Sequence, residues 1–287
     1  MNYQWYPGHM MKAKRMMQEN IKLIDLVIEW VDARIPLSSR NPDLDELGKG
    51  KARLVLLNKS DLADDECNRE WMAYLKKQGF FVLQINSKSG KGIKGISGTV
   101  REVCKEKIER DKKRGIKNRP IRAIVVGIPN VGKSTFINAF AGKACTKTGN
   151  KPGVTKGKQW IRLNKELELL DTPGILWPKF ESEQIGRNLA YIGSMNDEIL
   201  QIEELTIDLL GFLVIYYKNE LIDRFKLPED CTEPLKILEY ICEVRGCYKK
   251  GGETDYEKGA ALVLDDFRNG RMGRISLERP EDANENA

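Results

Sequence analysis

Residues 121–135 read IRAIVVGIPNVGKST, and this stretch decides the fold expected for the 287-residue chain. It opens with a short apolar run rich in β-branched residues, which is typical of a buried strand in a parallel sheet. Residues 127–134, GIPNVGKS, then match the pattern G-x-x-x-x-G-K-[ST], and apolar residues at helical spacing follow. A strand, a glycine-rich loop and a helix in this order predict an α/β domain with a doubly wound, mostly parallel sheet that binds nucleotide phosphates.

The residue types in this loop suit phosphate binding. Gly127 and Gly132 let the backbone curl until its N–H groups face the phosphates, and the helix N-terminus adds positive potential. We expect Lys133 to reach the β and γ phosphates, and Ser134 to place its hydroxyl on Mg²⁺. The loop residues expected at the phosphates are Gly127, Asn130, Val131, Gly132, Lys133, Ser134 and Thr135.

Two motifs further along the chain support the same site. In LELLDTPG, residues 167–174, the leucines predict a second strand with Asp171 at its carboxyl end, where open parallel sheets bind ligands. Asp171 is expected to hold Mg²⁺ directly or through a water, and the Gly174 N–H to meet the γ-phosphate. PGVT, residues 152–155, offers Thr155 as a second hydroxyl for Mg²⁺.

The motif for the base precedes the phosphate motifs. Residues 53–61, RLVLLNKSD, predict a strand that ends in a sequence resembling the N-K-x-D element of GTPases. The Asp61 carboxylate can accept hydrogen bonds from guanine N1–H and the 2-amino group, a donor pair that adenine lacks. Lys59 is expected to lie along the ring, and Asn58 to tie this loop to the phosphate loop.

A further predicted strand, residues 80–85, ends in Asn86-Ser87-Lys88, which is similar to the S-A-K element that contacts guanine O6. Ser87 and Lys88 are therefore the remaining candidates at the base. In ordinary GTPases both base motifs follow the phosphate motifs, so the order here predicts a circular permutation of the same sheet. Domain termini tend to lie close together, which makes such a rearrangement physically tolerable, and residues 101–120 would form the new connector.

Charge and composition limit the classes of function. Residues 1–175 hold 34 Lys+Arg against 19 Asp+Glu, a balance of +15, whereas residues 176–287 hold 14 against 23, a balance of −9. The first portion has the balance of a protein that binds polyanions. The six cysteines form no C-x-x-C pair, and a single histidine cannot complete a Cys2His2 site. Without an apolar span or a leader pattern, the cytoplasm is the expected location.

Several motifs together resemble one family. They are W-Y-P-G-H-M at 5–10, V-D-A-R-I-P-L-S-S-R-N-P at 31–42, NKSD, GIPNVGKS, PGVT, DTPGILWPKF at 171–180 and F-R-N-G-R-M-G-R-I at 267–275. This set resembles the circularly permuted ribosome-assembly GTPases of the RbgA/YlqF type over the whole chain. The resemblance implies a bacterial enzyme that binds a late precursor of the large (50S) subunit and its rRNA, and we expect a monomer. It would hydrolyse GTP faster on that particle and leave after hydrolysis.

The resemblance also has consequences for domains and ions. It implies a GTPase domain over residues 1–178 and a helical domain over 179–287, in which Arg268, Arg271 and Arg274 are candidate RNA contacts. In GTPases with a similar P-N-V-G-K-S loop the asparagine is linked to a bound K⁺. Asn130 is therefore the expected K⁺ residue beside the Mg²⁺ site.

The phosphate and base motifs do not identify the residue that directs the attacking water. Many GTPases place a glutamine directly after the D-x-x-G glycine, but Ile175 stands there and cannot hydrogen-bond a water. The resemblance implies that His9, the single histidine, is the missing catalytic group beside Lys133 and Asn130, since a neutral imidazole can accept a proton. The alternative is that His9 contacts RNA or packs against Trp5 and Tyr6.

Two other functions stay open at this point. One is a GTP-gated RNA-binding module in which hydrolysis is unimportant, which Ile175 favours. The other is a GTPase that acts on a non-ribosomal RNA, which the basic stretches allow.

Overall fold

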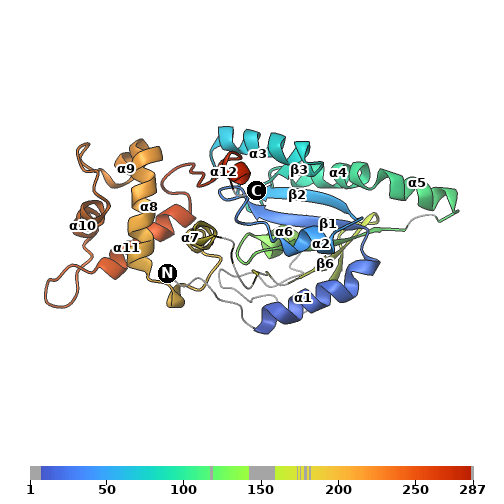
Figure 1. The fold of residues 1–287 in the computed structure, drawn as a ribbon, viewed down its shortest axis with the longest axis horizontal. Coiled ribbons are helices and arrows are strands. Elements are labelled where there is room, and N and C mark those ends of the chain that lie inside the picture. Colours follow the sequence, from blue (N-terminus) through green and yellow to red (C-terminus); the bar gives the residue numbers. More distant parts are fainter. Residues whose placement is uncertain are drawn as a thin grey trace. The chain divides into compact units, whose positions relative to one another are not determined.

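The computed structural model describes residues 8–116, 119–141, 159–172, 174, 176–177, 180 and 182–285. The chain forms two compact units. The sheet unit comprises Gln4–Phe180 and Ser276–Ala287, and the helical unit is Glu181–Ile275 (Figure 1). No helix in the described part of the chain has the length and apolar character needed to cross a bilayer.

The described residues of the sheet unit form a six-stranded sheet in the order β3-β2-β1-β4-β6-β5. All neighbouring strands pair in parallel except β5, which is antiparallel to β6. The strands are β1 (Leu26–Asp32), β2 (Ala52–Asn58), β3 (Phe81–Gln84), β4 (Ile121–Gly127), β5 (Gln159–Arg162) and β6 (Leu167–Asp171).

This topology confirms the predicted fold and its permuted order. The phosphate-loop strand β4 lies in the middle, with the first three strands of the chain on one side and the next two on the other. Every residue of β1 is buried, in agreement with the apolar runs expected for a sheet covered on both faces. The helices of this unit are α1 (Gly8–Asn20), α2 (Asp43–Leu47), α3 (Asp65–Lys77), α4 (Ile96–Val103), α5 (Lys105–Lys113), α6 (Lys133–Ala141) and α12 (Asp282–Glu285).

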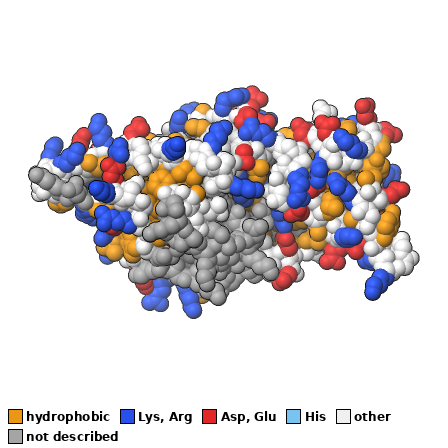
Figure 2. Space-filling view, turned by 180° about the vertical axis from the view of Figure 1, so that it is seen from behind, with side chains coloured by type: hydrophobic (Ala, Val, Ile, Leu, Met, Phe, Trp, Pro, Cys, Tyr) orange, Lys and Arg blue, Asp and Glu red, His pale blue; other side chains and the backbone are white. Residues whose placement is uncertain are grey.

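The connector expected at residues 101–120 is largely helical where the structure describes it. It contains the end of α4 and all of α5, and α5 has no buried residue. Asp25, directly before β1, contacts both the connector and β4: one carboxylate oxygen lies 3.6 Å from Lys107 Nζ, and the other accepts the N–H of Arg122 at 3.1 Å. Figure 2 shows Lys and Arg side chains over the end of the sheet unit that α4 and α5 form.

The last residues of the chain belong to the sheet unit, which corrects the expectation that 179–287 is one helical domain. Trp71 of α3 donates its indole N–H to the carbonyl of Glu278 at 3.1 Å, and Asp64 N donates to Ser276 Oγ at 3.1 Å. Ala283 joins the buried cluster around Trp71 and Leu75. Apolar contacts with α3, together with these two hydrogen bonds, therefore hold the end of the chain in the sheet unit.

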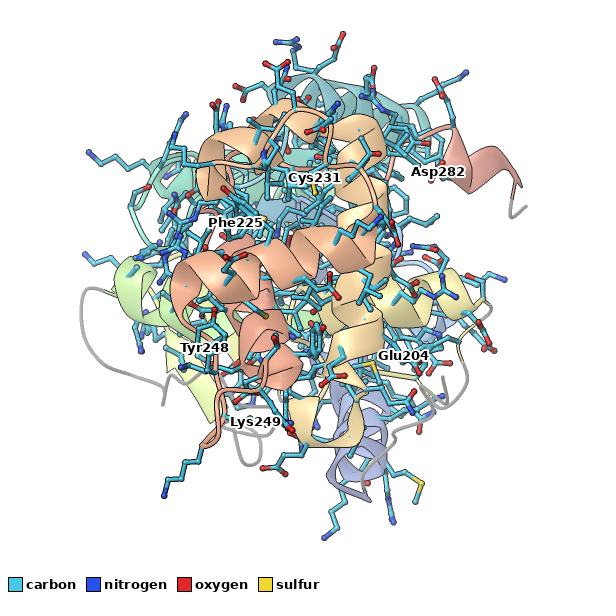
Figure 3. The ribbon with its side chains drawn as sticks, turned by 90° about the vertical axis from the view of Figure 1, so that its left-hand side faces the viewer. Glu204, Phe225, Cys231, Tyr248, Lys249 and Asp282 are labelled. Carbon is cyan, nitrogen blue, oxygen red and sulfur yellow. The ribbon has the colours of Figure 1, made fainter. Side chains whose placement is uncertain are left out.

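The helical unit contains α7 (Glu183–Tyr191), α8 (Ile202–Tyr216), α9 (Lys218–Phe225), α10 (Pro234–Arg245) and α11 (Tyr256–Arg268). Its core is formed where α8, α10 and α11 pack together. Gly246, in a left-handed conformation with φ of 63°, ends α10, as its position after the apolar pattern predicts. Figure 3 shows Tyr248 and Lys249 on the turn between α10 and α11.

Candidate nucleotide site at the carboxyl edge of the sheet

Four parallel strands end together at one edge of the sheet. The last residues of β1, β2, β4 and β6 are Asp32, Asn58, Gly127 and Asp171. Because the carboxyl ends of parallel strands lie at the same edge, the base motif and both phosphate motifs converge there. The permuted order along the chain thus yields one site in space.

The phosphate loop has backbone geometry that requires glycine at two positions. Gly132 has φ of +92°, and a Cβ built there would lie 2.6 Å from Asn58 Nδ2. A Cβ on Gly127 would lie 2.4 Å from the carbonyl oxygen of Trp30. Both glycines therefore permit a close backbone approach that a larger residue would prevent.

Lys133, the first residue of α6, folds back over the loop. Its Nζ donates to the carbonyl oxygens of Gly127 at 3.0 Å and Ile128 at 2.7 Å. Burial lowers the pKa of Lys133 to about 8, although the nearby Asp171 acts in the opposite direction. A phosphate at this point would supply the anion that a buried ammonium needs. On the same first turn Ser134 is half-buried and Thr135 is exposed.

Asn58 connects the base motif to the phosphate loop, as its position after the strand predicts. Its Nδ2 donates to the carbonyl oxygen of Val131 at 2.6 Å. Its Oδ1 accepts from the Ser87 N–H at 3.0 Å and from the Ser87 hydroxyl at 2.8 Å. One buried amide therefore links three loops that come from distant parts of the sequence, and both donors of Ser87 bind to it. Trp30 adds a second donor to the Val131 carbonyl, at 2.9 Å.

The remaining candidate residues for the base differ in exposure, and Lys59 is half-buried. Asp61 and Lys88 are exposed, and the Lys88 N–H is held by Asn86 Oδ1 at 2.9 Å. Lys59 has a left-handed backbone, with φ of 57°, and its Nζ lies 3.0 Å from Asp32 Oδ2. The sequence motifs did not indicate this pairing.

Asp32 and Arg34 form a buried ion pair behind Lys59. Arg34 donates from Nε to Asp32 Oδ1 and from Nη2 to Oδ2, both at 2.9 Å. Burial by itself would raise the pKa of Asp32, but the charges of Arg34 and Lys59 outweigh it and hold the pKa well below its usual range. The signal available in the sequence was D-A-R directly after a buried strand, which places an acid and a base at the edge that binds ligands.

Asp171 has the surroundings of a metal ligand. It is fully buried at the end of β6, and within the described part of the chain neither carboxylate oxygen has a hydrogen-bond partner. Burial raises the pKa of Asp171 to about 6, partly offset by Lys133. Buried carboxylate oxygens without a hydrogen-bond partner fit Mg²⁺, which prefers oxygen ligands. The described residues contain no group of three His, Cys, Asp or Glu side chains that would suit another metal.

The glycine of the D-T-P-G motif packs directly on the phosphate loop. A Cβ on Gly174 would lie 2.7 Å from both N and Cα of Pro129. Asn130, the next residue of the loop, has φ of 59°, a left-handed conformation that asparagine tolerates better than most residues. Thr155 and Ile175 lie outside the described residues. His9 falls in the first turn of α1, but its side chain lies outside them too.

In the helical unit, Arg268, one of the three candidate RNA contacts, is held by contacts within the protein. Its guanidinium donates to the carbonyl oxygens of Tyr191 at 3.0 Å and Ala190 at 2.8 Å, where α7 ends. It also pairs with both carboxylate oxygens of Asp197, at 2.7 and 2.8 Å. Arg271 pairs with Asp265 and Asp266.

Known proteins are similar to this chain in sequence and in fold. Residues 122–232 match the family described as "50S ribosome-binding GTPase". The chain is 48% identical to "Ribosome biogenesis GTPase A" of Bacillus cereus, over 98% of this chain and 95% of that protein. It is also 48% identical to the protein of that name from Priestia megaterium, over 99% of each. The crystal structure of GNP-bound YlqF from T. maritima is 29% identical, with a TM-score of 0.65, over 94% of this chain and 99% of that one.

Proposed function

The chain belongs to the ribosome biogenesis GTPase A family, and we propose that it acts as a monomer on a late precursor of the large ribosomal subunit in the cytoplasm. It is a GTPase, and its role is in ribosome assembly. We further propose that it binds the rRNA of the precursor and is released after GTP hydrolysis. The observation that carries the proposal is the convergence of the base and phosphate motifs, which Asn58 links by hydrogen bonds.

We propose separate roles for the residues at the nucleotide, of which Thr155 lies outside the described part of the chain. Asp61 would select guanine, with Lys59 along the ring. Lys133 and the loop N–H groups would hold the phosphates, and Ser134, Thr155 and Asp171 would hold Mg²⁺. When bound, Mg²⁺ supplies positive charge to the β and γ phosphate oxygens. Gly174, packed on Pro129, would bring its N–H to the γ-phosphate.

The first experiment measures GTP turnover at fixed K⁺, with and without purified 50S subunits. We expect stimulation by orders of magnitude, because the loop after Gly174 carries Ile175 where a water-positioning glutamine would stand. Turnover that does not respond to 50S subunits would refute activation by the particle. Co-sedimentation with 50S subunits, in competition with tRNA, would separate a ribosomal from a non-ribosomal RNA partner.

We propose His9 as the group that orients the attacking water when the particle is bound. His9→Ala should lower the stimulated kcat by about 10²-fold or more and leave GTP affinity nearly unchanged. Met11→Ala is the matched control, since Met11 lies on the same helix and is 61% exposed. Stimulated turnover equal to that of the control would make His9 a contact residue only.

We propose that Asn130 helps to bind a K⁺ ion, which would neutralise charge at the phosphates. Asn130→Gly removes the side chain and still allows the left-handed backbone at this position. The variant should lose any difference in rate between K⁺ and Na⁺ while it retains GDP binding. Equal rates of the unmodified protein in the two salts would refute K⁺ use.

The alternative of a GTP-gated RNA-binding module also has support in the structure. α5 has no buried residue, and Lys105, Arg110, Lys112 and Lys113 on it are exposed. Such a helix can bind phosphate backbones without any contribution from hydrolysis. A variant that binds GTP but does not turn it over, and still supports subunit assembly, would favour this alternative.

A further inference from the structure

The end of the chain lies along the loop that follows β1. We call Ser276–Arg279 the C-terminal strap. Its Leu277 N–H donates to the carbonyl oxygen of Arg34 at 2.9 Å. The Glu278 carboxylate accepts the N–H groups of Leu37 at 2.7 Å and Ser38 at 3.0 Å, and it also accepts the Ser38 hydroxyl. Glu278 is only 5% exposed, so these bonds are shielded from water.

The loop that the strap contacts contains Arg34, which pairs with Asp32 next to the base motif. Arg34 is 1% exposed and grips both oxygens of Asp32, and its own N–H donates to Asp32 Oδ1 at 3.1 Å. Asp32 in turn lies 3.0 Å from Lys59 Nζ. The backbone of this loop therefore joins the strap, which it contacts at Arg34, Leu37 and Ser38, to the side-chain contacts that run from Arg34 through Asp32 to the lysine of the base motif.

This chain of contacts has a physical consequence for Lys59. A lysine side chain loses up to about 2 kcal/mol of conformational entropy when it is ordered. The Asp32 carboxylate restrains the Lys59 ammonium before any nucleotide arrives, so this entropic cost is met during folding and not at binding. Asp32 remains ionised across the working pH range, since the charges of Arg34 and Lys59 hold its pKa well below the usual value against the effect of burial.

We propose that the C-terminal strap, through Arg34 and Asp32, is a positioning element of the guanine site that pre-orders Lys59 for the base. The inference rests on the proposed placement of Lys59 along the guanine ring. The strap follows directly on the helical unit in sequence, so a segment more than 200 residues from the base motif contributes to nucleotide affinity. GTP and GDP are affected alike, because both carry the same base.

A double-mutant cycle on fluorescently labelled GDP tests this role. Glu278→Gln removes the charge that holds the loop at Leu37 and Ser38 but preserves the shape of the side chain. It should weaken GDP binding by about 2- to 12-fold, the range that ordering one rotamer-rich side chain covers. Glu281→Gln, an exposed glutamate three residues further on, is the control and should bind GDP as the unmodified protein does.

The Lys59→Met background separates positioning from simple stabilisation. If the strap acts through Lys59, Glu278→Gln should have no further effect on GDP affinity in that background. An equal fold-loss in both backgrounds, or no loss in either, would overturn the proposal. Asp32→Asn should repeat the pattern and gives a second test, with thermal unfolding measured in parallel to verify that each variant is folded.

The same experiment distinguishes failure of the inference from failure of the Lys59 assignment. Lys59→Met alone should weaken the binding of GDP and of IDP, which lacks the 2-amino group, by similar factors. If Lys59→Met leaves GDP affinity unchanged, the placement of Lys59 at the base is wrong and the inference falls with it. If Lys59→Met weakens binding and Glu278→Gln does not, only the inference is refuted.

Discussion

Replacement of Asn58 by alanine tests the link between the base motif and the phosphate loop. Asn58 is 2% exposed and takes part in three hydrogen bonds, one to Val131 O and two from Ser87. Asn58→Ala removes all three at once. Because the amide joins loops that the sequence places far apart, its loss should be felt both in stability and in nucleotide binding.

The magnitude follows from what each partner can do afterwards. The Val131 carbonyl keeps the Trp30 indole N–H as a donor at 2.9 Å, and the Ser87 hydroxyl can rotate to another acceptor. The Ser87 N–H is buried and is left unsatisfied, which costs about 1–3 kcal/mol. With about 1 kcal/mol for the lost bond to Val131, the free energy of unfolding should fall by about 2–4 kcal/mol. That corresponds to a drop in Tm of roughly 4–16 °C.

The assay is urea unfolding of the nucleotide-free protein, together with GDP titration. We expect GDP affinity to fall about tenfold or more, because the phosphate loop loses the hydrogen bond that holds it in place. A tenfold change in Kd corresponds to about 1.4 kcal/mol of binding free energy. Asn58→Asp is the matched variant, since it keeps the acceptor for Ser87 and changes only the contact with Val131. It should also destabilise the protein, because it places a carboxylate oxygen where Nδ2 now lies 2.6 Å from Val131 O. A loss below about 0.5 kcal/mol for Asn58→Ala, or full stability of Asn58→Asp, would refute this reasoning.

Three further predictions concern Asp171, Gly174 and the helical unit. Because burial raises the pKa of Asp171 to about 6, above its unfolded value, its ionisation opposes folding as the pH rises from about 4 to 6. Asp171→Asn should therefore raise the unfolding free energy of the nucleotide-free protein by about 1–3 kcal/mol at pH 7.5, with a gain that shrinks below pH 6. It should also abolish the Mg²⁺ dependence of GTP binding. An unchanged or lowered unfolding free energy at pH 7.5 would contradict the prediction. Gly174→Ala forces a methyl group against the Pro129 backbone at 2.7 Å, so it should reduce GTP turnover about tenfold or more with a smaller effect on GDP affinity, and normal turnover would exclude this close packing. Arg268→Ala removes the donors at the end of α7 and leaves Asp197 without its bidentate partner. It should lower the unfolding free energy of the helical unit by about 1–3 kcal/mol without a loss of RNA binding; a selective loss of RNA binding would instead support Arg268 as an RNA contact.

Several features of this protein are determined by the sequence alone. The strand, loop and helix around Gly127 and Gly132, and the order of motifs that reveals the permutation, depend on local backbone geometry, which residue types specify directly. The helix of the C-terminal region that starts at Pro234 and stops at Gly246 was predictable for the same reason, since caps and breakers act within a few residues.

Other features were decided only by the tertiary structure. An acid and a base two residues apart, such as Asp32 and Arg34, look like ordinary surface charges until the sheet buries them behind Lys59. From the sequence, Arg268 is indistinguishable from other basic residues of the C-terminal region, whereas in the structure it contacts Asp197 and the end of α7. The return of the strap to Trp71 and Ser38 joins residues about 200 apart. Periodicity and composition report local conformation and burial, whereas partners so distant along the chain are selected by the packing of the whole sheet unit.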